Sequence, residues 1–97
     1  MLHRWGFVYL SPGTDPTRTV ADSGDRVAVL VGVPTVEDAP AAARALVTEG
    51  AQLVELCGGF GPVHTARVIE AIDDAVPVGA VSYGPEATDR LHEIFGG

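Results

Sequence analysis

The stretch Leu53–Pro62, which reads LVELCGGFGP, decides the fold of this chain. Its first five residues are apolar apart from Glu55, which is typical of a strand covered on both faces in a parallel sheet. Three glycines follow and can form a tight turn, and Pro62 then stands where a helix would begin. A strand, a turn and a helix in this order predict a βα unit. We expect this helix to bury Val63, Ala66, Ile69 and Ile72.

A second βα unit precedes this stretch. The run Val27–Val33 is continuous and largely β-branched, which again predicts a covered strand. We expect the next helix over residues 38–49, because Asp38 can serve as its N-cap and Pro40 then falls in the first turn. Gly50 is suited to end that helix. Its expected buried stripe consists of Ala39, Ala43 and Leu46.

A third βα unit closes the chain. The run Val76–Ser82 predicts a strand, and Gly84-Pro85 repeats the glycine-proline entry into a helix. Helical spacing predicts that the apolar side chains of this last helix face the core, namely Ala87, Leu91, Ile94 and Phe95.

The N-terminal part contains the remaining strand. Alternation along Arg4–Leu10 places Trp5, Phe7 and Tyr9 on one face, which we interpret as part of the core or of a dimer interface. Residues 14–25 are polar and read as a loop, with a short helix or an extra edge strand as alternatives.

The order of these elements predicts an α/β fold, β-loop-(βα)3, as a single domain over residues 1–97. We expect a small, mainly parallel four-stranded sheet with three helices, either as an open sheet or as a half-barrel-like sheet. Parallel strands end at the same edge, so the turns marked by glycine or proline are expected to gather there.

Composition excludes several classes of function. The net charge is −7, with 13 acidic residues against 6 scattered arginines, which argues against nucleic-acid and anionic-membrane partners. The chain has no lysine, so chemistry that needs a Schiff-base lysine or a Walker A lysine is excluded. One cysteine, no apolar run of about 18 residues and no leader-like N-terminal segment together predict a cytoplasmic protein.

Four segments carry a resemblance that covers nearly the whole chain. They are Trp5–Leu10, Val31–Pro34, Gln52–Pro62 and Pro77–Gly84, and the most specific is the Glu-Leu-Cys-Gly-Gly-Phe-Gly-Pro segment. In these segments the chain resembles a family of small bacterial proteins catalogued as a domain of unknown function. The resemblance implies an α/β domain and supplies no activity, cofactor or catalytic residue.

The glycine turn is the candidate binding site. Backbone N–H groups at Gly58, Gly59, Phe60 and Gly61 lead into a helix N-terminus, which favours a small anionic ligand such as a phosphate or carboxylate. Ser82 and Tyr83 end the next strand and are expected at the same edge. The alternative is a tight turn that needs its glycines for backbone geometry alone. A dinucleotide fingerprint is incomplete, and we expect neither a cofactor nor a metal.

Three side chains near this turn are candidates for chemistry. Glu55 could act as a general base if buried, Cys57 could be a nucleophile, and His64 could pair with it. The alternatives are an ion-paired Glu55, a Cys57 that packs as a small hydrophobic residue, and a surface His64. The sequence leaves open whether the protein is an enzyme.

A second function fits the size of the chain. With 97 residues the hydrophobic core is thin, and self-association would cover more apolar surface. The alternative to ligand binding is therefore a non-catalytic homo-oligomeric module, and both functions are compatible if a pocket forms between subunits.

Overall fold

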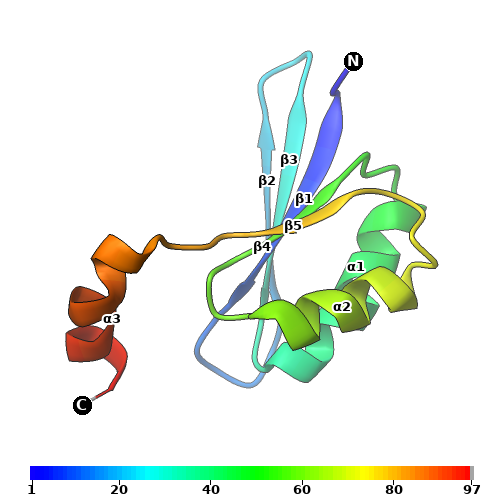
Figure 1. Ribbon diagram of the computed structural model, residues 1–97. Helices are drawn as coiled ribbons and strands as arrows, with labels where there is room; N and C mark the ends of the chain where they lie inside the picture. The colour runs from blue at the N-terminus through cyan, green and yellow to red at the C-terminus, as the bar shows by residue number, and fades with distance from the viewer. Residues whose placement is uncertain (97) are drawn as a thin grey trace.

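A five-stranded sheet with two helices packed on one face organises the molecule, which we describe from a computed structural model covering residues 1–96 (Figure 1). The strand order is β2-β3-β1-β4-β5. β1, β3, β4 and β5 are parallel, and β2 pairs antiparallel with β3. The strands are β1 (Arg4–Leu10), β2 (Thr17–Asp22), β3 (Val27–Val33), β4 (Val54–Leu56) and β5 (Val78–Ala80).

The predicted four-stranded sheet is therefore wrong by one strand. Within residues 14–25, the alternative of an extra edge strand is the one that holds, and the sheet is open, with β2 and β5 at its edges. All six residues of β2 are exposed, so this strand carries no alternation of buried and exposed positions that a sequence could reveal. A turn through Gly24, with φ +98°, joins β2 to β3.

Three α-helices follow the parallel strands. They are α1 (Ala39–Thr48), α2 (Pro62–Ala71) and α3 (Thr88–Phe95), and short 3-10 turns, η1 (Val36–Asp38) and η2 (Pro85–Ala87), precede α1 and α3. Pro40 lies in the first turn of α1, and Gly50 follows its end with φ +98°, as predicted. Asp38 is the N-cap of α1, although its carboxylate accepts hydrogen bonds from the backbone N–H and hydroxyl of Thr35.

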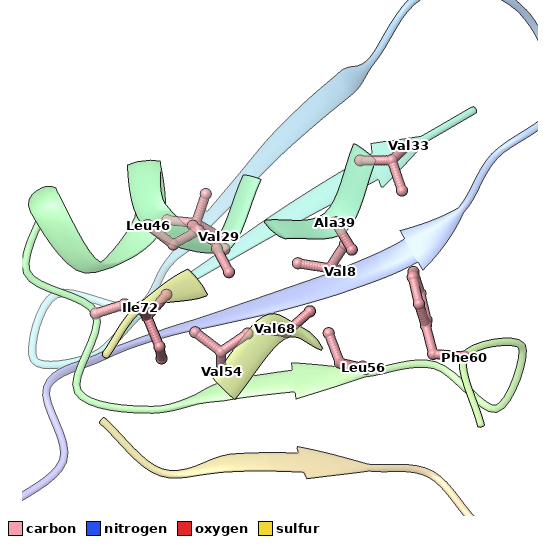
Figure 2. Packing of buried hydrophobic residues seen from close by; sticks show 12 residues of the cluster. Val8, Val29, Val33, Ala39, Leu46, Val54, Leu56, Phe60, Val68 and Ile72 are labelled. Atoms are coloured by element: carbon pink, nitrogen blue, oxygen red, sulfur yellow. The ribbon is translucent and has the colours of Figure 1, made fainter. Parts of the chain in front are cut away.

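The core lies between the sheet and the pair α1 and α2 (Figure 2). Alternate strand residues face these helices, so Val8, Val29, Val54 and Leu56 are fully buried. Ala39, Ala43 and Leu46 of α1 meet them, as predicted.

The predicted buried stripe of α2 is partly wrong. Of the four predicted residues, Ile72 is buried and Ile69 is half-buried, whereas Val63 is 60% exposed and Ala66 is exposed. The buried residue of α2 is Val68, which lies outside the predicted stripe. Apolar residues occur around most of this helix, so spacing alone could not identify the side that meets the sheet.

The predicted inward orientation of α3 is wrong as well. None of its residues is buried, and Ile94 and Phe95 are 69% and 81% exposed. Amphipathic spacing indicates a face that needs cover, and no element within residues 1–96 supplies that cover. Over residues 1–96, no helix combines the length and apolar character needed to cross a bilayer.

Candidate functional site

The carboxyl ends of the four parallel strands meet at one edge of the sheet, as the sequence predicts. Backbone hydrogen bonds extend the pairing one residue beyond β1, β4 and β5: the N–H of Ser11 donates to the carbonyl of Val33, that of Cys57 to Val8, and that of Val81 to Leu56, at 2.9–3.0 Å. From β1 the chain leads toward β2 and β3, whereas from β4 it leads toward α2 and β5. Ligands of open α/β sheets bind at such switch points.

Each glycine of the turn after β4 occupies its position for a different structural reason. A Cβ atom on Gly59 would lie 2.7 Å from Cδ1 of Leu10, so a larger residue here would displace the Leu10 side chain. Gly61 is the N-cap of α2 with φ 50° and ψ 175°, a conformation that is strained for other residues. A Cβ on Gly58 would lie 3.3 Å from the ring of Tyr83. The glycines therefore bring Leu10 and Tyr83 onto the turn.

The turn also leaves backbone donors unused. Phe60 N–H bonds to the carbonyl of Cys57, and Thr65 N–H bonds to that of Gly61. Within residues 1–96, several other N–H groups meet no protein acceptor, namely those of Gly58, Gly59, Gly61, Val63 and His64. Such donors at the N-terminus of a helix favour an anion.

A cleft of 620 Å³ opens between this turn and α3. Ligand sites in proteins commonly occupy about 300–1,000 Å³. Its lining is mostly apolar and contains no carboxylate side chain, although the chain is strongly acidic. The residues that line it are Gly58, Gly59, Tyr83, Leu91, His92, Phe95 and Gly96.

The predicted binding residues divide between two hollows. Gly58, Gly59 and Tyr83 line the large cleft. Gly58 also borders a hollow of 380 Å³ between α2 and β5, together with Gly61 and Ser82. Phe60 lines neither hollow, because its ring is 1% exposed and packs in the core (Figure 2).

The candidate chemical residues do not form one cluster. Glu55 is exposed in the middle of β4, between the buried Val54 and Leu56, so it lies on the face away from α1 and α2. His64 lies in the first turn of α2 on the opposite face, and Cys57 is half-buried against the core. Residues 1–96 contain no group of three His, Cys, Asp or Glu side chains placed to hold a metal ion.

Sequence reasoning missed the contribution of α3 to the cleft. Leu91 and Phe95 are one helical turn apart, and their spacing predicts that they face the core. The same spacing fits a helix that lines a cleft, so the sequence contained no signal to separate the two cases.

Comparison with known proteins identifies the family. The sequence model of a family matches residues 3–96, which include the glycine turn and α3. The chain belongs to DUF6506, a family of unknown function. The expected resemblance to such a family is thus confirmed, and the β1-to-α3 architecture described above is that of a DUF6506 chain. No curated protein and no solved structure matches this DUF6506 chain.

Proposed function

We propose that this DUF6506 protein binds a small molecule in the cleft between the glycine turn and α3. The ligand would combine an anionic group, a carboxylate or phosphate, with a flat apolar part. One observation carries the proposal: unpaired backbone donors at Gly58 and Gly59 border a cleft whose other residues are largely apolar.

Charge supports this ligand chemistry. The protein as a whole repels anions, because its net charge is −7. The residues that line the cleft, however, include one histidine, His92, and neither Asp nor Glu. The unpaired backbone N–H groups of Gly58 and Gly59 can supply the attraction that clustered arginines supply elsewhere. Tyr83, 62% exposed beside Gly58, offers a ring face for the apolar part of the ligand.

The proposal covers binding and assigns no reaction. Glu55 and His64 lie on opposite faces of the sheet, so they do not supply a paired acid and base to one substrate. Cys57 packs against the core, as a small hydrophobic residue does.

Thermal denaturation with chemically graded probes tests the proposal. Phenyl phosphate and phenylacetate are expected to raise the melting temperature, because a ligand that binds the folded state stabilises it. Inorganic phosphate should act weakly, and benzyl alcohol, which lacks the charge, should have no effect. If neither charged aromatic probe raises the melting temperature, the proposal is wrong.

Variants locate the site. Tyr83→Ala removes a ring from the cleft and is expected to weaken binding of phenyl phosphate about tenfold in calorimetric titration. Val20→Ala is the matched control, because Val20 is also exposed but lies on β2, outside the cleft lining. Equal affinity in both variants would place the bound probe elsewhere and contradict the assigned site.

A further inference from the structure

The face of the sheet opposite α1 and α2, which we call the open face, is built as an aromatic platform. Trp5, Phe7 and Tyr9 of β1 alternate with the buried residues Gly6 and Val8, so they point to this side. Leu30 of β3 pairs with Phe7 and extends the platform toward β2. An apolar sheet face in an α/β fold is ordinarily covered by a helix.

Two of the aromatic rings on the open face are held in place by their neighbours. Phe7 and Tyr9 stack with their ring centroids 6.3 Å apart and 19° between planes. A Cβ on Gly32 would lie 2.9 Å from Cζ of Tyr9, so the ring lies over this glycine. The Tyr9 hydroxyl pairs with that of Thr17 at 3.1 Å. These contacts fix the positions of Phe7 and Tyr9 before any partner binds.

Helix α3 lines the cleft but buries none of its own residues. Figure 1 shows it apart from the sheet at the end of an extended segment. Leu91, Ile94 and Phe95 fall on one side of this helix, and Ile94 and Phe95 remain mostly exposed. The same chain thus contains an apolar sheet face and an apolar helix face that do not meet.

The short segment between β5 and η2 makes it difficult for α3 to fold back onto the open face of its own chain. The hydrogen bond from Val81 N–H to Leu56, at 2.9 Å, keeps the chain in the sheet as far as Val81. Tyr83 then lies against Gly58 at the carboxyl edge, and η2 begins at Pro85. The three residues Ser82–Gly84 span at most about 10 Å, so α3 starts beyond the edge of its own sheet.

We propose that α3 of one copy covers the open face of a second copy, reciprocally, in a two-fold symmetric dimer. A hollow of 510 Å³ beside Trp5 and Ala28 on this face has room for an apolar side chain of α3. Glu55, which has no ion-pair partner within residues 1–96, lies on the same face, and α3 supplies Arg90. Exchange in both directions buries on the order of 1,000 Å², the size at which specific interfaces begin.

Sedimentation equilibrium tests the dimer. The full chain of 10.0 kDa is expected to sediment as two chains, and Phe95→Glu is expected to raise the dissociation constant at least about 100-fold. Val20→Glu is the matched control, because Val20 is 51% exposed on the side of β2 away from the open face. A monomeric parent protein, or a Phe95→Glu variant that associates as the parent does, would overturn the proposal.

Cross-linking tests which surfaces meet. In a Cys57→Ser background, one variant carries Thr19→Cys on the open face and the other Ile94→Cys on α3. Mild oxidation of the mixture is expected to join the two variants, whereas Val20→Cys in place of Thr19→Cys is expected to stay unlinked. If a single chain with both Thr19→Cys and Ile94→Cys closes on itself and the mixture does not cross-link, α3 covers its own sheet and the exchange is refuted.

Discussion

A glycine-proline pair marks the entry into both α2 and the turn η2 that leads to α3, yet the two helices have very different surroundings. α2 begins at Pro62 after Gly61 and packs Val68 against the sheet. α3 follows the pair Gly84-Pro85 and buries none of its residues. Both helices are amphipathic in sequence. The pattern predicts that the apolar face of each helix is covered, but it does not indicate whether the same chain or another chain covers it.

The largest expected effect comes from placing a charge on each helix. Val68→Asp buries an unpaired carboxylate and is expected to lower the free energy of unfolding by more than about 4 kcal/mol. Ile94→Asp at its exposed site is expected to change the stability of the dilute monomer by less than about 0.5 kcal/mol. Urea denaturation followed by circular dichroism measures both values, and similar losses in the two variants would mean that α3 packs within its own chain.

The two glycine-proline entries are expected to differ by a smaller amount. Gly61→Ala forces a side chain onto φ 50° and should cost about 1–3 kcal/mol of unfolding free energy. Gly84 has φ −77°, and its added Cβ would meet chiefly the mobile carboxylate of Glu86, so Gly84→Ala should be nearly neutral. Denaturation midpoints of the two variants test the difference, and an equal cost would contradict the strain assigned to Gly61.

The smallest expected effect concerns the covered side of the sheet, where Glu49 after α1 pairs with Arg18 and Arg4. The hydrogen bond from Arg18 lowers the pKa of the Glu49 carboxyl below its usual value. A lowered pKa stabilises the fold above the pKa of the unfolded chain, and this contribution is lost as the pH falls through the folded pKa. Glu49→Gln should slightly reduce the loss of stability in acid, measured by melting temperature against pH. An unchanged acid profile would show that the pair is screened.

Strands with buried alternate residues were the most predictable part of the fold. The bounds of β1 and β3 agree with the sequence prediction, because packing against the core on one face of the sheet requires apolar residues at alternate positions. The sequence of β2 has no pattern of alternate buried residues, because this strand is held in place by hydrogen bonds to β3 and buries none of its residues. The position of α3 depends on how three linker residues leave the sheet, and residue spacing does not encode that direction.

The sequence indicated where the candidate site lies in the fold, but it did not indicate which residues line the cleft. Glycine and proline mark the turn after β4 directly, and parallel strands then place Tyr83 beside Gly58. The division of Gly59 and Ser82 between two hollows follows from the course of the backbone around Gly58. Alternate residues of β4 point to opposite faces of the sheet, so Glu55 lies on the face away from His64. The sequence alone does not say which of the two faces the helices cover, so it could not predict this separation.

The central position of β1 sets the order in which the chain can assemble. β1 is synthesised before β3 and β4 and pairs with one of them on each side, so Phe7 has no paired neighbour until Leu30 and Glu55 have been made. β2 and β3 form the local hairpin, whereas every contact of β1 closes a long loop. Refolding should therefore be slow for a chain of this length, and during translation the aromatic strand emerges well before its neighbours and depends on them for protection from aggregation.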